Sequence, residues 1–204
     1  MSFRIEEKLS IDNNKIIDFK SFLANKTAKQ IYLPRKIQSL YFENLNYEMY
    51  SDSLEGLTPR KKIRVRNYPS TEDKNQYLEM KISSVEGRFK TRKIIDKSKF
   101  NYIKTKGILD SQYGLCKPCL YVIYDREYFK IDDVRISIDN NITYKLYPEN
   151  IYEKDETSIV EIKTSIKKNL DKLTEDFPFQ KNRFSKYCNA VEKIIFEKNK
   201  YKLI

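Results

Sequence analysis

Charged side chains recur at every second position in short segments along most of the chain, and this alternation strongly limits the folds available to it. In residues 60–66 the even-numbered residues are Arg60, Lys62, Arg64 and Arg66, and they alternate with Lys61, Ile63 and Val65. Successive residues of a β-strand point to opposite faces, so this segment is predicted to be a strand with one charged and one mostly apolar face. The pattern recurs in residues 4–8, 78–82, 88–92, 124–126, 135–139 and 158–164.

The periodicity predicts a mainly antiparallel β fold with a few helices. We predict strands over residues 3–10, 37–43, 47–50, 61–68, 76–83, 88–95, 120–129, 135–139 and 158–164. Helical spacing is found over residues 15–25, 98–106, 167–176 and 183–198. No Gly/Ser linker, low-complexity tract or repeat divides the sequence, so we predict a single domain over residues 1–204.

Composition narrows the possible functions. The 40 Lys and Arg residues outnumber the 29 Asp and Glu residues, which gives a net charge of +11 and favours an anionic partner. The chain has no histidine, which excludes Ser-His-Asp and Cys-His catalysis and histidine-containing zinc sites. Three cysteines, a charged N-terminus and no long apolar run predict a cytoplasmic protein without a membrane segment.

The charged strand faces allow two interpretations. They are either the solvent-facing side of an open sheet, or the interior of a closed barrel whose apolar side packs outward against helices. The near-exclusive use of Arg, Lys and Glu on these faces favours the barrel. Cations enclosed in this way need an anion as partner, and Glu6, Glu79 and Glu161 are suitable ligands for Mg²⁺ or Mn²⁺. Together they favour a phosphate-rich ligand.

The same residues carry a family resemblance. The segments, in order along the chain, are RIEEK at 4–8, SLYFEN at 39–44, RKKIRVRNY at 60–68, LEMK at 78–81, FKTR at 89–92, YDR at 124–126, VRISID at 134–139, VEIK at 160–163 and RFSKY at 183–187. In this set and order, the chain resembles the VTC domain, a polyphosphate polymerase domain of the CYTH-like triphosphate tunnel metalloenzyme superfamily.

The resemblance implies an eight-stranded antiparallel tunnel barrel with a charged interior, flanked by helices that include a C-terminal helix. It implies that ATP and inorganic polyphosphate bind in the tunnel together with Mn²⁺ or Mg²⁺. The implied catalytic charges are Arg64, Arg66, Lys81, Lys90, Arg126, Arg135 and Lys186. The implied substrate contacts are Arg4, Lys8, Lys62, Arg92, Lys163 and Tyr124. Glu161 would hold the metal, and Glu6 and Glu79 would either bind metal or pair with neighbouring cations.

The implied reaction transfers the γ-phosphoryl group of ATP to the end of a polyphosphate chain. Because a phosphate acceptor is already anionic at neutral pH, the lack of a histidine base is no obstacle. A triphosphatase or tripolyphosphatase and a non-catalytic polyphosphate-binding module remain open alternatives. A nucleic-acid binder is disfavoured because carboxylates lie on the same strand faces as the cations. A redox or zinc role for Cys116 and Cys119 is also disfavoured, since the chain offers only Cys188 as a further thiol.

Overall fold

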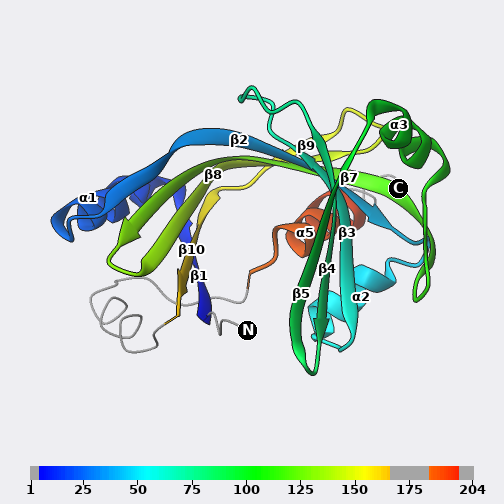
Figure 1. Cartoon of the computed structure of the whole chain (residues 1–204), viewed down its shortest axis with the longest axis horizontal. Coiled ribbons are helices and arrows are strands. Elements are labelled where there is room, and N and C mark those ends of the chain that lie inside the picture. The colour runs from blue at the N-terminus through cyan, green and yellow to red at the C-terminus, as the bar shows by residue number, and fades with distance from the viewer. Residues whose placement is uncertain (1–4, 166–183, 198–204) are drawn as a thin grey trace. The chain divides into compact units, whose positions relative to one another are not determined.

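The computed structural model describes residues 5–165 and 184–197, and most of them lie in β-strands (Figure 1). The strands are β1 Ile5–Asp12, β2 Lys29–Glu43, β3 Arg60–Asn67, β4 Gln76–Ser84, β5 Gly87–Ile95, β6 Ile108–Asp110, β7 Gly114–Ile131, β8 Val134–Leu146, β9 Tyr152–Lys154 and β10 Thr157–Thr164. The helices are η1 Asn13–Lys15, α1 Ile16–Asn25, α2 Glu48–Glu55, α3 Lys97–Lys106, α5 Lys186–Ala190 and the π-helix η2 Val191–Glu197.

All strands belong to one hydrogen-bonded sheet. Its main path is β1-β10-β8-β7-β2-β3-β4-β5, and β6 and β9 pair at its sides with β7 and β8. The pairings β1–β10, β10–β8, β2–β3, β3–β4, β4–β5 and β6–β7 are antiparallel. The eight strands of the main path agree with the predicted number. Within the described residues the hydrogen-bond ladder does not close between β1 and β5.

The chain forms two compact units. Unit 1 comprises Met1–Lys36, Tyr124–Ile142 and Lys154–Phe184, and its core is built on the apolar faces of β1, β8 and β10. Leu9, Ile136 and Val160 come from these strands, and Phe19 and Leu23 of α1 pack against them. Phe19 and Leu23 are four residues apart and therefore lie on one side of the helix. The charged positions of β1 and β10 consequently project from the opposite side of the sheet.

Unit 2 comprises Ile37–Ile123, Thr143–Glu153 and Ser185–Ile204. Leu40, Ile63 and Val65 from β2 and β3 form its core with Met49 of α2 and Ile103 of α3. Each of these side chains is at most 3% exposed. Both units are assembled from segments far apart in the sequence, and the single domain over residues 1–204 remains a prediction.

The structure corrects the prediction for residues 47–50. They are not a strand, because α2 begins at Glu48. The carboxylate of Glu43, at the end of β2, accepts hydrogen bonds from the backbone N–H groups of Met49 (3.2 Å) and Tyr50 (2.9 Å). The side chain of Asn44 accepts from the N–H of Glu48 at 2.9 Å. The first N–H groups of a helix lack partners within the helix, and these acceptors satisfy them.

The other predicted elements differ mainly in length. β2 begins at Lys29 and β7 at Gly114, both earlier than predicted, and β6 and β9 were not predicted. The described part of the predicted C-terminal helix is α5, which continues as η2. The predicted helix at 167–176 and the ends of the one at 183–198 lie outside the described residues. No helix in the described part of the chain is long and apolar enough to cross a membrane.

Candidate phosphate-binding and metal-binding faces

The charged face of unit 2 is ordered by the register of β3, β4 and β5. Lys62, Lys81 and Lys90 lie opposite one another in one row across the three strands. The neighbouring row contains Arg64, Glu79 and Arg92, and Tyr41 of β2 pairs with Arg64 at its end. Residues that face each other in antiparallel strands project from the same side of the sheet. Arg66 belongs to the following row, between Ser39 and Tyr77, so six predicted site cations of unit 2 share one face.

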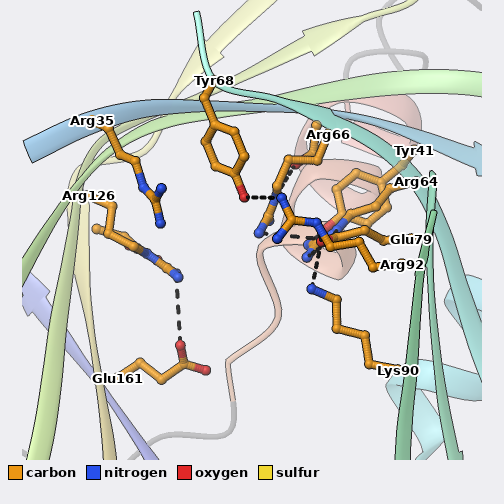
Figure 2. Close-up of polar contacts among 12 residues, drawn as sticks. Arg35, Tyr41, Arg64, Arg66, Tyr68, Glu79, Lys90, Arg92, Arg126 and Glu161 are labelled. Carbon is orange, nitrogen blue, oxygen red and sulfur yellow. Dashed lines mark hydrogen bonds and ion pairs between the residues drawn. The ribbon is translucent and has the colours of Figure 1, made fainter. Parts of the chain in front are cut away.

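Glu79 is the centre of this face, and its carboxylate is contacted by four cations (Figure 2). One oxygen accepts from Arg64 Nη2 at 2.6 Å and Nε at 2.8 Å, and the other accepts from Lys90 Nζ at 2.6 Å. Arg92 Nε lies 3.6 Å and Arg66 Nη1 3.9 Å from the carboxylate. The Glu79 side chain is 1% exposed. Of the two roles predicted for Glu79, this geometry corresponds to pairing with neighbouring cations.

Positive charge exceeds negative charge on this face. The sequences of β3, β4 and β5 contain Glu79 as their one carboxylate. Burial raises the pKa of Glu79, but Arg64 and Arg66 outweigh burial and lower it to about 2. Burial likewise opposes ionisation of the buried Tyr41 phenol, and the same two guanidinium groups still lower its pKa below the usual value. A buried phenol responds in this way only where the local potential is positive.

Polar groups hold several of these cations in place. Arg64 Nη1 donates to the Tyr41 hydroxyl at 2.8 Å, and Arg66 Nε donates to Ser39 Oγ at 3.1 Å. Lys62 Nζ donates to Ser185 Oγ at 2.8 Å. Ser185 directly precedes Lys186, the first residue of α5.

Tyrosine rings support the other end of the same face. The guanidinium of Arg92 lies 3.7 Å from the centre of the Tyr77 ring and donates to the Tyr68 hydroxyl at 3.3 Å (Figure 2). The cations are thus positioned by the protein itself, which reduces the entropy lost when an anion binds.

The charged face of unit 1 holds more carboxylate. Glu6, Lys163 and Arg135 form one row across β1, β10 and β8, and Lys8, Glu161 and Ser137 form the next. The carboxyl groups of Glu6 and Glu161 share a hydrogen bond. Burial and the negative charge of Glu161 raise the pKa of Glu6, whereas the pKa of Glu161 is lowered by this hydrogen bond, Lys163 and Arg126 against the effect of burial. One proton shared by two carboxyl groups is the usual result of placing them this close.

Arg126 joins the carboxylates of this unit. Its guanidinium forms a two-bond contact with Asp139, with Nη2 2.6 Å from Oδ2, and Nη2 also lies 3.8 Å from Glu161 Oε2 (Figure 2). Lys163 Nζ lies 3.2 Å from Glu161 and 4.0 Å from Glu6. Lys8 Nζ lies 3.5 Å from Glu6 and donates to the Phe184 carbonyl at 3.3 Å. The Arg126 guanidinium also lies 5.3 Å from the centre of the Tyr124 ring.

The Glu6 and Glu161 pair suits a divalent cation in chemical terms. Mg²⁺ is commonly bound by one or two carboxylates, with substrate phosphates and water supplying the other ligands. Two carboxyl groups that share a proton can both ionise when a metal ion replaces that proton. The described residues contain no cluster of three or more Asp, Glu, Cys or His that could hold a metal ion. A metal ion at Glu6 and Glu161 would therefore need phosphate oxygens or water as its other ligands. Glu6 and Glu161 are therefore suitable ligands for a divalent metal ion. The carboxylate of Glu79 is instead occupied by ion pairs with Arg64, Arg66, Lys90 and Arg92.

Several predicted site residues are either exposed or outside the described part of the chain. Arg4 is outside the described residues. Arg135 and Lys81 are exposed members of their rows. Several groups on or beside the two faces were given no site role by the sequence, namely Ser39, Tyr41, Tyr68, Asp139 and Arg35, whose Nε donates to the Tyr128 hydroxyl at 2.7 Å. Of these, Asp139 was placed only on the charged face of its strand. Charge alternation identifies cations but gives no signal for the hydroxyl groups that hold them.

The cysteine pair has no visible chemical role. Cys116 and Cys119 are both free thiols, and they are three positions apart on β7, so they point to opposite faces. Burial raises the pKa of Cys116 to about 12, and it raises that of Cys119 as well. Because the thiolate is the reactive and metal-binding form, both groups are expected to be inert.

Solved structures share the fold at low sequence identity. A candidate adenylate cyclase of Bacillus halodurans superimposes with a TM-score of 0.63 at 12% identity, over 96% of this chain and 100% of the other. A candidate adenylyl cyclase of Hippeastrum gives 0.60 at 14% identity, over 92% and 95%. A third, from Vibrio parahaemolyticus, gives 0.56 at 12% identity, over 93% and 98%. These similarities confirm the predicted fold class.

The sequence comparisons identify the family. No curated protein matches the chain. The family model described as the VTC domain matches residues 3–195, which is nearly the whole sequence and includes every strand of both charged faces. The chain therefore belongs to the VTC domain family.

Proposed function

We propose that this protein is a metal-dependent phosphotransferase that moves the γ-phosphoryl group of ATP onto a polyphosphate chain. The observation that carries the proposal is the cation excess on β3, β4 and β5, where Glu79 is the one carboxylate among six site cations. Such a face binds a ligand with several closely spaced negative charges better than a monovalent anion. Phosphoanhydride chains have this property, and the VTC family match supports the choice.

The residues of unit 2 would bind and orient phosphate oxygens. Arg64 and Arg66 are held by Glu79, Tyr41 and Ser39, so their guanidinium groups would meet a phosphate with little reorganisation. Lys62, Lys81 and Lys90 would add charge to phosphate groups along the next row. In the reaction, a terminal oxygen of the acceptor chain forms a bond to the γ-phosphorus while the bond to the β,γ-bridging oxygen breaks, and ADP leaves. These cations would stabilise the charge on the transferred group.

The residues of unit 1 would supply the metal site. Glu6 and Glu161 would hold Mg²⁺ or Mn²⁺, which neutralises charge on phosphate oxygens when it is bound. Lys163 and Arg126 would keep Glu161 ionised and oriented, since both contact its Oε2. The cytoplasm, where ATP and Mg²⁺ are abundant, is the compartment that we propose for this reaction.

A triphosphatase is the second candidate, and one comparison favours it. The Hippeastrum protein of similar fold is described as having a dominant triphosphatase activity. The same faces would perform hydrolysis if water, instead of a phosphate oxygen, attacked the γ-phosphorus. The two candidates therefore differ in the acceptor and not in the way the triphosphate is bound.

Incubation of the purified protein with ATP and either Mn²⁺ or Mg²⁺ separates the candidates. Long-chain polyphosphate as product supports the polymerase, and free phosphate alone supports the triphosphatase. If neither forms while tripolyphosphate still binds, the protein is a binding module and the enzymatic proposal is wrong.

Two variants with matched controls test the residue roles. Glu161→Gln should abolish metal-dependent turnover, whereas Glu156→Gln, at an exposed residue of the same unit, should not. Lys90→Ala should weaken tripolyphosphate binding by about 1 to 3 kcal/mol, as expected for one lost charged hydrogen bond. Lys93→Ala, on the opposite face of the same strand, should leave it unchanged. Equal effects of Lys90→Ala and Lys93→Ala would contradict the assignment of the face.

A further inference from the structure

Helix α3 and the β6–β7 hairpin of unit 2 form a second basic surface, which neither charged face uses. We call it the α3–hairpin surface, and it consists of Lys99, Tyr102, Lys106, Leu109, Leu115 and Lys117. All six side chains are exposed. Large apolar side chains beside lysines on one surface indicate a partner that is both apolar and anionic.

The helix contributes a stripe of exposed residues. Phe100 and Ile103 of α3 pack into the core of unit 2, which fixes the side of the helix that faces inward. Lys99, Tyr102 and Lys106 are three and four residues apart and lie together on the outward side. Lys99 Nζ lies 5.3 Å from the centre of the Tyr102 ring, and Tyr102 is 59% exposed.

The hairpin contributes a pair of leucines. Leu109 of β6 lies directly opposite Leu115 of β7, so both project from the same side of the hairpin. The neighbouring pair, Ile108 and Cys116, belongs to the core of unit 2 and occupies the other side. Leu109 is 82% and Leu115 51% exposed. Two adjacent leucines turned to water lose the stabilisation that burial would give them.

The stripe and the leucine pair are continuous. Lys117 Nζ donates to the Thr105 carbonyl of α3 at 3.4 Å. Gly107 connects α3 to β6 with a φ of +93°, and a Cβ at this residue would lie 3.0 Å from Leu115 Cδ1 and 3.2 Å from Lys117 Cδ. The last turn of α3 is therefore packed against the hairpin.

Within the residues that the structure describes, the lysines of this surface have no ion-pair partner. The sequence of α3 contains four lysines and no carboxylate. The nearest acidic residues along the chain are engaged elsewhere, because Asp96 caps the N–H of Lys99 at 2.6 Å and Asp110 binds Lys61 Nζ at 3.0 Å. Within the described part of the chain, no ion pair involves Lys99, Lys106 or Lys117.

We propose that the α3–hairpin surface docks on the surface of an anionic lipid bilayer. Leu109 and Leu115 insert among the acyl chains near the headgroups, Tyr102 lies at the interface, and the lysines contact anionic headgroups. A nucleic acid would satisfy the lysines but would leave the leucine pair in water. If the surface instead binds an acidic protein, the chain will not bind anionic vesicles, and the lipid proposal is wrong. The proposal is independent of the reaction catalysed.

Co-sedimentation of the whole chain with vesicles tests the proposal. We expect binding to phosphatidylcholine vesicles that contain phosphatidylglycerol and little binding to phosphatidylcholine alone. The double variant Lys99→Gln with Lys106→Gln should lower the partition coefficient about 30-fold, since each lysine near an anionic surface contributes roughly fivefold. The double variant Leu109→Ser with Leu115→Ser should lower it roughly tenfold through lost apolar contact.

Matched variants keep the test specific. Lys29→Gln with Lys130→Gln removes the same charge from exposed positions of unit 1, and Leu33→Ser with Leu45→Ser removes two other exposed leucines. Both controls should bind vesicles like the unaltered protein, and circular dichroism should show that all variants are folded. Absence of vesicle binding, equal binding to neutral vesicles, or equal losses in test and control variants would each overturn the proposal.

Discussion

Replacement of Glu79 by glutamine should make the protein less stable and, at the same time, a tighter binder of tripolyphosphate. The substitution keeps the shape of the side chain and removes the one negative charge that Arg64, Arg66, Lys90 and Arg92 share. The pKa of Glu79 falls from 4.5 to about 2 in the folded protein. This difference corresponds to about 3 kcal/mol, which is similar to the loss expected when one partner of a buried ion pair is removed.

The effect on stability should depend on pH in a defined direction. Because the folded pKa of Glu79 is depressed, its contribution is fully present above the unfolded pKa of 4.5 and is lost as the pH falls toward about 2. The unaltered protein and Glu79→Gln should therefore differ in free energy of unfolding at neutral pH and converge on acidification. Urea denaturation at a series of pH values measures both quantities.

The effect on binding should have the opposite sign. A phosphate group at roughly 8 Å from the lost carboxylate, at an effective dielectric constant of about 20, gains about 2 kcal/mol, or roughly 30-fold in affinity. Tripolyphosphate should then raise the melting temperature of Glu79→Gln more than that of the unaltered protein. If Glu79 were a metal ligand, the variant would instead lose metal-dependent binding. Weaker binding together with unchanged stability would refute the role derived for Glu79.

Three further predictions concern single groups of unit 2. The pKa of Tyr41 should lie below the usual tyrosine value, and tripolyphosphate should raise the pKa of Tyr41 by offsetting the positive potential of Arg64 and Arg66. The difference in ultraviolet tyrosinate absorbance between the unaltered protein and Tyr41→Phe, followed as the pH is raised, measures this pKa. In denaturant titrations, Glu43→Ala should lower the free energy of unfolding by about 3 kcal/mol and Tyr187→Phe by about 1 kcal/mol. The alanine leaves several buried donors without an acceptor, whereas the phenylalanine removes only one donor. Gly107→Ala should lower the melting temperature, since the new Cβ would lie 2.5 Å from the Cys116 carbonyl oxygen at a φ of +93°.

The alternation of charged and apolar residues was sufficient to predict the strands of the two charged faces, β1, β3, β4, β5, β8 and β10, and which side of each is charged. It placed Arg64 and Arg66 on one side of β3 and Ile63 on the other, and the core of unit 2 confirms that division. A period of two determines the face of every residue in a strand, and this information is local. Register is not local, because it depends on how each turn aligns two strands. The rows that bring Lys62, Lys81 and Lys90 together could therefore be read only from the structure.

The error at α2 shows what local patterns leave out. Residues 47–50 include two tyrosines, which favour a strand in the sequence alone. Their helical conformation depends on Glu43, whose carboxylate accepts from α2 and also from the hydroxyl of Tyr187 in α5, a residue 144 positions away. Burial raises the pKa of Glu43 even though these hydrogen bonds act to lower it. No sequence window contains both ends of such a contact.

The two charged faces differ in a way that separates their chemistry. On β3, β4 and β5 of unit 2, six site cations accompany Glu79, and Arg64 and Arg66 lower the pKa of the buried Tyr41 phenol against the effect of burial. In unit 1, the carboxylates Glu6, Asp139 and Glu161 lie among Lys8, Arg126, Arg135 and Lys163, and two of them are close enough to share a proton. The first arrangement favours an anion and the second favours a divalent cation. A magnesium complex of a triphosphate contains both, so variants of the two faces should be separable by assay: substitutions in unit 2 should reduce binding of tripolyphosphate without metal, whereas substitutions of Glu6 and Glu161 should reduce only the increment that metal adds.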